Sequence, residues 1–194
     1  IEVEKRLPIG GGLGGGSSDA ATTLIALNAL WNTGFARPAL QALGARLGAD
    51  VPFFVFGRNA WVEGIGERLS PLDLPPVWYL VLVPPVGVPT GEIFAAAELT
   101  RDTEALKIED FSANEGVCRL RNDLEPVVLA RYPAVREHLE WLSRHAEARM
   151  TGSGACVFAR FEDRASAERV LAKLPGNMKG FIAQGLGEHP LRAL

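Results

Sequence analysis

The spacing of hydrophobic residues changes along this chain from helical to extended, and the mixture predicts an α+β fold. Residues 19–31 have helical spacing, and a second helix is expected over 38–47, where Pro38 suits a first turn. The expected inner face of the first helix comprises Ala20, Ala21, Leu24, Leu27 and Trp31. The expected inner face of the second comprises Leu40, Leu43 and Leu47.

The remaining pattern predicts two lobes. The segment 70–76, Ser-Pro-Leu-Asp-Leu-Pro-Pro, is the best boundary between domains and predicts one domain over 1–75 and another over 76–194. The expected extended segments are 1–6, 60–69, 77–83, 149–151, 155–161 and 181–184. The expected helices are 92–99, 124–146 with a break near Pro133, and 165–174. This order suggests a ferredoxin-like second lobe.

Composition excludes several classes of protein. A hydrophobic content of 47% and a net charge of −3 indicate a globular chain, and the basic residues are too scattered for a nucleic-acid surface. No segment approaches the length of a membrane span. The cysteines Cys118 and Cys156 give neither a disulfide framework nor metal-ligand spacing, and Cys156 lies in an apolar stretch typical of a buried thiol. These features favour a cytoplasmic setting, although a targeting segment before Ile1 would not be visible.

A glycine-rich loop precedes the first helix. Six of the seven residues from Gly10 to Gly16 are glycine, and Ser17 and Ser18 follow. Glycine lets backbone N–H groups approach an anion closely, and a helix N-terminus attracts negative charge. The loop therefore predicts a phosphate-binding site.

Three other interpretations of the loop are weaker. A flexible linker would not run directly into an amphipathic helix. The dinucleotide-binding pattern requires an acid about 20 residues later, but residues 20–49 contain none. The P-loop pattern requires a lysine after the glycines, where this chain has Ser17.

Several strings resemble the GHMP kinases, a superfamily that includes galactose, homoserine and mevalonate kinases. They are 8–21 (PIGGGLGGGSSDAA), 47–54 (LGADVPFF), 63–67 (EGIGE), 88–94 (VPTGEIF), 122–124 (NDL) and 151–158 (TGSGACVF), in order along nearly the whole chain. Within the superfamily they are most similar to the branch that phosphorylates 4-diphosphocytidyl-2-C-methyl-D-erythritol in the non-mevalonate isoprenoid pathway of bacteria.

The resemblance implies a two-lobed GHMP kinase fold that uses ATP and Mg²⁺, with Asp50 as the catalytic base. Asp50 also suits a helix N-cap, and Thr90 suits either a substrate contact or an N-cap. Lys5 is expected to be at most a phosphate or substrate contact, and Ser18 could contact Mg²⁺. The residues expected to bind ATP are Pro8, Ile9, Gly10, Gly11, Gly12, Leu13, Gly14, Gly15, Gly16, Ser17 and Ser18. Asp19 could approach the Mg²⁺ and is expected rather to favour the helix N-terminus by its charge. The 151–154 turn braces the loop, lines the cleft between the lobes or forms a plain hairpin.

The same resemblance implies that a strand-rich segment with a lysine partner for the aspartate precedes Ile1 in the family. We therefore expect an incomplete first lobe and little turnover by residues 1–194 alone. Two alternatives stay open: another small-molecule kinase of the superfamily, of homoserine or mevalonate type, and a chain that binds nucleotide without catalysis. The expected partner is the small-molecule substrate, with no nucleic acid and no membrane, and the oligomeric state stays open.

Overall fold

The computed structural model describes residues 1–193 except 105, 107 and 109–119, so Cys118 lies outside the described residues. The described chain forms two compact units. The sheet unit contains Ile1–Leu13 and Pro76–Gly185, and the helical unit contains Gly14–Pro75 and Leu186–Leu194. One change of unit falls at Pro75, beside the predicted boundary, but both chain ends join the unit opposite to the one expected. The division into domains 1–75 and 76–194 stays a prediction.

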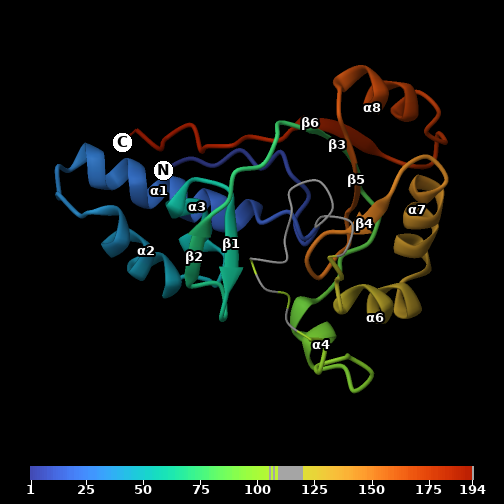
Figure 1. Cartoon of the computed structure of the whole chain (residues 1–194), viewed down its shortest axis with the longest axis horizontal. Coiled ribbons are helices and arrows are strands. Elements are labelled where there is room, and N and C mark those ends of the chain that lie inside the picture. Colours follow the sequence, from blue (N-terminus) through green and yellow to red (C-terminus); the bar gives the residue numbers. More distant parts are fainter. Residues whose placement is uncertain (105, 107, 109–119, 194) are drawn as a thin grey trace. The chain divides into compact units, whose positions relative to one another are not determined.

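The sheet unit has the predicted ferredoxin-like topology. Its strands are β3 (Trp78–Leu82), β4 (Ala148–Met150), β5 (Val157–Phe161) and β6 (Gly180–Gln184), in the spatial order β4-β5-β3-β6. All three pairings are antiparallel. With α6 (Leu124–Arg131) and α7 (Pro133–Ser143) after the first strand and α8 (Arg164–Leu171) after the third, the order is β-α-β-β-α-β (Figure 1).

The core of the sheet unit lies between this sheet and its helices. Leu80 pairs with Ala159 on one side and Ile182 on the other. Leu80 packs in one cluster with Val128, Val135 and other residues of α6 and α7. The break in the long helix falls at Tyr132, directly before Pro133, because proline fits a first turn and cannot continue a helix. The prediction of a helix broken near Pro133 is confirmed.

The helical unit consists of three helices and a hairpin. The helices are α1 (Gly15–Leu30), α2 (Arg37–Ala45) and α3 (Val51–Phe56), and β1 (Ala60–Glu63) pairs antiparallel with β2 (Arg68–Pro71). The helical core contains Ala21, Ile25, Leu40, Val51 and Val55. Its longest helix has 16 residues, and within the described ranges no helix could span a membrane.

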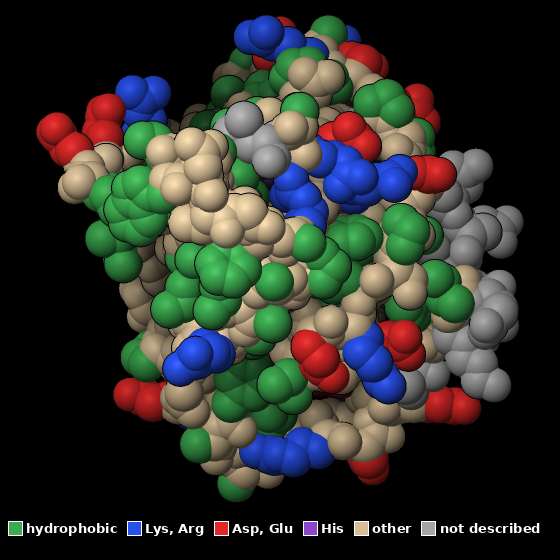
Figure 2. Space-filling model, turned by 90° about the vertical axis from the view of Figure 1, so that its left-hand side faces the viewer, with side chains coloured by type: hydrophobic (Ala, Val, Ile, Leu, Met, Phe, Trp, Pro, Cys, Tyr) green, Lys and Arg blue, Asp and Glu red, His purple; other side chains and the backbone are tan. Residues whose placement is uncertain are grey.

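The predicted inner faces of the first two helices were partly wrong. Ala21 and Leu40 are buried, but Leu43 and Leu47 are exposed, and Trp31 is 67% exposed. Trp31 follows the last residue of α1, so it lies beyond the turns that pack on α3. The exposed large hydrophobic residues of this unit are Leu30, Trp31, Phe35, Leu43, Leu47, Val62, Ile65 and Leu186. Figure 2 shows hydrophobic side chains exposed among scattered charges on the face that it presents.

Two further predictions of secondary structure are corrected. Residues 1–6 form no strand and are exposed, because no described strand pairs with them and a lone strand has no ladder of hydrogen bonds. The helix expected over 92–99 is the shorter α4 (Thr90–Phe94). Beyond its end, the carbonyls of Phe94 and Ala96 accept hydrogen bonds from the Arg101 side chain.

Candidate active site

The glycine loop has a backbone that residues with side chains would rarely adopt. Gly10, Gly12 and Gly14 have φ values of +72°, +72° and +66°. This left-handed region is open to glycine and strained for most other residues. The loop therefore needs glycine at these three positions for conformational reasons alone.

The first half of the loop is docked onto the 151–156 turn of the sheet unit. The carbonyl oxygen of Gly11 accepts hydrogen bonds from the Thr151 hydroxyl (2.8 Å) and from the backbone N–H of Cys156 (3.1 Å). A Cβ added to Gly12 would lie 2.5 Å from the carbonyl oxygen of Thr151 and 2.8 Å from that of Gly154. Such close approach is possible only without a side chain, so Gly12 is required by contact as well as by φ.

The turn that receives the loop is itself held by an amide. The Asn122 side chain donates from Nδ2 to the carbonyl of Gly152 at 2.7 Å and to that of Met150 at 3.3 Å. Its Oδ1 accepts the backbone N–H of Leu124 at 3.1 Å. The 151–154 turn joins β4 to β5 and also contacts the loop, so the hairpin and the bracing of the loop are observed together.

Thr90 begins α4 but does not cap it. The N-cap position belongs to Pro89, without a side-chain capping bond. The Thr90 hydroxyl lies 2.7 Å from that of Ser153, in the turn that holds the loop. Thr90 is exposed, and its contact with substrate stays a prediction.

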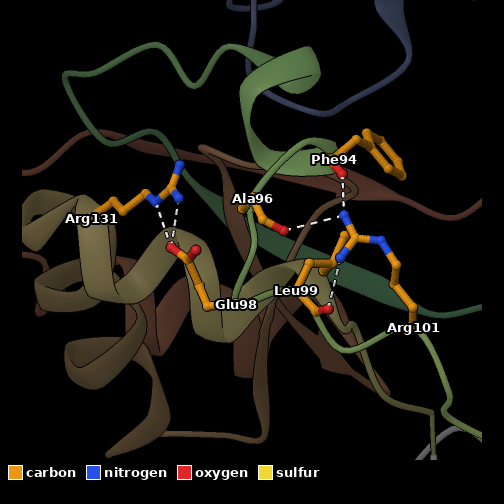
Figure 3. Close-up of polar contacts among 6 residues, drawn as sticks. All are labelled: Phe94, Ala96, Glu98, Leu99, Arg101 and Arg131. Atoms are coloured by element: carbon orange, nitrogen blue, oxygen red, sulfur yellow. Dashed lines mark hydrogen bonds and ion pairs between the residues drawn. The ribbon is translucent and has the colours of Figure 1, made fainter.

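The segment after α4 is tied down by arginines, as Figure 3 shows. Arg101 donates to the carbonyl oxygens of Phe94 (2.8 Å), Ala96 (3.2 Å) and Leu99 (3.1 Å). Arg131 of α6 donates to Glu98 at 2.9 and 2.6 Å. The backbone N–H of Glu98 and the Arg131 side chain lower the pKa of the Glu98 carboxyl. These contacts hold the C-terminal end of α4, whose first residue is Thr90.

The second half of the loop forms the start of α1. Gly14 occupies the N-cap position, no side chain caps the helix, and its first turn contains no acid. The amides of that turn have no partner within a regular helix. The helix begins four residues before the predicted start, so Asp19 lies in its second turn. The expected role of Asp19 at the N-terminus is therefore not observed, since the dipole acts within the first turn.

Asp50 lies directly before α3. It occupies the N-cap position with φ −84° and ψ −15°, but its carboxylate accepts no capping hydrogen bond. The N-cap position was thus predicted correctly from sequence, whereas the capping bond is absent. Asp50 is exposed, so its carboxylate can reach a ligand.

The turn that carries Asp50 contacts the tip of the β1–β2 hairpin. Gly66 has φ +119°, and a Cβ there would lie 2.7 Å from the carbonyl oxygen of Ala49. The hairpin tip is closed by the Glu67 carboxylate, which accepts the backbone N–H of Ile65 at 2.7 Å. Backbone N–H groups of Glu67 itself and of Ile65 lower the pKa of this carboxyl. The tip therefore supports Ala49, the residue before Asp50.

Helix α3 also contacts the start of α1. A Cβ added to Gly14 would lie 2.9 Å from Cζ of Phe54. Phe54 is one helical turn after Asp50, and its N–H lies 3.4 Å from the Asp50 carbonyl. Asp50 therefore lies one helical turn, about 5.4 Å of rise, from the residue whose ring contacts Gly14.

Cys156 is a structural thiol, as its apolar surroundings predict. It is buried, and a Cβ on Gly11 would lie 2.8 Å from its Sγ. Burial raises the pKa of the Cys156 thiol to about 11. The thiol therefore stays protonated near neutral pH and is poorly nucleophilic.

The predicted ligand-binding residues are divided between the units. The sheet unit contains Lys5, residues 8–13 and Thr90. Lys5 and Ile9 are exposed and lie outside regular structure. Residues 14–18 and Asp50 belong to the helical unit. Within each unit, the structure joins Thr90 to the loop through Ser153, and Asp50 to α1 through Phe54.

Two supporting residues were missed by sequence reasoning. Asn122 was recognised only as part of a motif, and nothing in its spacing indicated a bond to a turn 30 residues away. Gly66 was likewise only part of a string. The presence of glycine in an expected extended segment is the signal that could have indicated close backbone contact.

Models of two domains match the sequence. The model of the GHMP kinases N-terminal domain matches residues 1–58, and that of the GHMP kinases C-terminal domain matches residues 95–180. The chain is 62% identical over 191 residues to a 4-diphosphocytidyl-2-C-methyl-D-erythritol kinase of Thiobacillus denitrificans, covering 98% of this chain and 67% of that protein. It is 60% identical over 192 residues to the kinase of the same name from Aromatoleum aromaticum, covering 99% of this chain and 66% of that protein. The chain thus spans about two thirds of the length of these relatives.

Solved structures agree with this assignment. A crystal structure of 4-(cytidine 5'-diphospho)-2C-methyl-D-erythritol kinase superposes with a TM-score of 0.78 at 35% identity, over 93% of this chain and 68% of that one. A homoserine kinase from Cytophaga hutchinsonii shares the fold alone, with a TM-score of 0.69 at 16% identity, over 95% of this chain and 69% of that one. The two domain models, the close relatives and the shared fold lead to one conclusion: the chain belongs to the GHMP kinase family.

Proposed function

We propose that the protein containing this chain transfers the γ-phosphoryl group of ATP to the 2-hydroxyl of 4-diphosphocytidyl-2-C-methyl-D-erythritol. The observation that carries the proposal is the uncapped start of α1, directly after a loop whose alternate glycines have positive φ. The names of relatives at 60% and 62% identity support the choice of substrate.

The start of α1 is suited to hold phosphate. Its first-turn amides meet neither a capping side chain nor an acid, and the helix dipole favours an anion there. Ser17 and Ser18 add hydroxyl groups within the first helical turns. We assign the polyphosphate of ATP to residues 8–18.

Asp50 is assigned as the proton acceptor. Its carboxylate is exposed and is not used for capping, and it lies on the helix whose Phe54 touches Gly14. The carboxylate accepts the proton of the substrate hydroxyl while that oxygen bonds to the γ-phosphorus. The bond from this phosphorus to the β-γ bridging oxygen breaks, and ADP leaves with the electron pair.

The Mg²⁺ expected with ATP would be held mainly by the nucleotide. Among the described residues no cluster of three or more His, Cys, Asp or Glu side chains could bind a metal. Mg²⁺ commonly keeps waters and binds through substrate phosphates with few protein ligands. The bound ion would neutralise charge on the phosphates, and the Ser18 hydroxyl is the protein group assigned to it.

Two residues are assigned to the sugar-alcohol substrate. Thr90 presents an exposed hydroxyl, fixed by its contact with Ser153. Lys5 is exposed and lies a few residues before the loop, so its ammonium group is assigned to a phosphate of the substrate.

Purified protein that carries this chain at the length of its relatives tests the proposal. ADP release is measured with the cytidylyl substrate, homoserine or mevalonate, for native protein and for Asp50→Asn, with the product identified by ³¹P NMR. We expect turnover with the cytidylyl substrate only, and a kcat about 10²- to 10⁴-fold lower in the variant. ATP affinity should change little. Preference for another alcohol would refute the substrate, and near-native turnover by Asp50→Asn would refute the base.

A further inference from the structure

The C-terminal end of α3 lies one short helix away from Asp50. The helix has six residues and rises about 9 Å. Val51 and Val55 pack α3 into the helical core, and the orientation of so short a helix depends in addition on how its two ends are held. The last carbonyls of a helix have no partner within it, and in α3 the carbonyls of Val55 and Phe56 are bound by side chains from outside the helix.

Two arginine side chains bind these carbonyls. Arg37, the first residue of α2, donates from Nη1 to the carbonyl oxygen of Val55 at 2.8 Å. Arg192 donates from Nη1 to the carbonyl oxygen of Phe56 at 3.2 Å. Cations are favourable at this end of a helix because the dipole is negative there.

Arg37 also binds the C-terminal tail, residues 186–193. Its Nη2 donates to the carbonyl oxygen of Arg192 at 2.7 Å. One half-buried guanidinium thereby joins the start of α2, the end of α3 and the tail. A lysine could not make the same junction, because a single ammonium lacks the two fixed, divergent donors of the guanidinium.

The tail has further contacts that hold it in place. The backbone N–H of His189 donates to the carbonyl of Gly57 at 2.9 Å. Glu188 forms an ion pair with Arg192 at 3.2 Å. Leu191 packs against the hydrophobic cluster that contains Val51 and Val55. The tail is therefore a fixed partner for Arg37.

We propose that Arg37 is a positioning residue for Asp50: through Val55 and the tail, it fixes the orientation of α3 and thereby of the carboxylate at the other end. The inference rests on the proposed function, in which Asp50 accepts the substrate proton. Misplacing a reacting group by about 1 Å can lower a rate about 100-fold, so a tilt of this short helix is enough to affect catalysis.

Arg37→Ala, Arg37→Lys and Arg46→Ala test the inference in the protein that carries this chain at the length of its relatives. Arg46→Ala is the matched control. Arg46 is exposed and occupies the C-cap position of the same helix α2, and its replacement removes the same charge. We expect Arg37→Ala to lower kcat about 10- to 100-fold with KM for ATP unchanged within about twofold. Arg37→Lys should fall between Arg37→Ala and native protein, and Arg46→Ala should match native protein.

A double-mutant cycle with Asp50→Asn separates positioning from general destabilisation. If Arg37 acts through Asp50, adding Arg37→Ala to Asp50→Asn should lower the residual rate by less than about twofold. Reduction of the residual rate by the same factor as in native protein would overturn the proposal. If Arg37→Ala does not fold, the same cycle with Arg37→Lys decides the matter.

The cycle also distinguishes this inference from the proposed function. Absence of turnover in native protein, or full activity of Asp50→Asn, contradicts the proposed function itself. Native turnover that depends on Asp50 but is unaffected by Arg37→Ala contradicts only the role of Arg37.

Discussion

The hydroxyl of Thr151 donates a hydrogen bond to the carbonyl oxygen of Gly11, across 2.8 Å and 140 residues of sequence. The bond fixes the first half of the glycine loop on the turn between β4 and β5. The same hydroxyl lies 3.2 Å from the Cys156 carbonyl, so the loop and the turn share one donor. The conformation of the loop is therefore set in part by residues far from it in sequence.

Replacing Thr151 tests this relationship. Thr151→Val removes the hydroxyl with little change of shape and leaves the Gly11 carbonyl with only the Cys156 N–H. We expect the free energy of unfolding to fall by about 1–2 kcal/mol and KM for ATP to rise, because the loop is less firmly held. Thr151→Ser keeps the donor, so its free energy of unfolding and its KM for ATP should both be close to the native values. Urea denaturation and steady-state kinetics measure them, and a Thr151→Val variant with native KM would contradict the role of the bond.

The hairpin tip next to Asp50 gives a second prediction. In Gly66→Ala the new methyl would lie 2.7 Å from the carbonyl oxygen of Ala49, at a φ of +119°. The hairpin tip or the turn that carries Asp50 must shift, and because the two are in contact we expect kcat to fall while KM for ATP changes little. Backbone strain of this kind costs about 1–3 kcal/mol, which a thermal or urea unfolding curve would detect.

Gly34→Ala is the matched control for the hairpin variant. Gly34 also has a positive φ, +71°, but nothing lies within 4 Å of an added Cβ. Gly34→Ala should lose stability, because alanine is strained at this positive φ, but its kcat should stay native. Equal kcat values in the two variants would show that contact with Ala49 does not matter for catalysis.

Local patterns were sufficient to predict much of the fold. The broken helix at Pro133, the hairpin around residues 152–154 and the buried strand β3 each depend on neighbouring residues, and each was predicted correctly. The phosphate-binding role of the glycine loop stays a prediction, whereas the need for glycine there is explained by positive φ and by the contact of Gly12 with Thr151. The start of α1 was placed too late, because glycine has a poor helix propensity and yet Gly15 and Gly16 form the first turn.

The supports of the site could not be predicted in the same way. The Arg37 side chain binds a carbonyl 155 residues away, and Asn122 binds a turn 30 residues away. Such bonds from side chain to backbone require no particular residue type at the acceptor, so they leave no pattern in the sequence. The candidate base and loop were visible from residue types and from resemblance, whereas the contacts that orient them appear only in three dimensions.

Cys156 predicts how stability depends on pH. Burial raises the pKa of its thiol from 9.0 to about 11, so between these values the unfolded chain releases a proton that the folded chain keeps. The stabilisation is complete below about pH 9 and is lost as the pH rises toward 11, with a slope of at most about 1.4 kcal/mol per pH unit. Urea unfolding of Cys118→Ser and of Cys118→Ser/Cys156→Ala from pH 8 to 10.5 isolates the thiol, because other titrating groups are common to both. We expect the steeper decline with Cys156 present, and parallel curves would contradict a buried, protonated thiol beside Gly11.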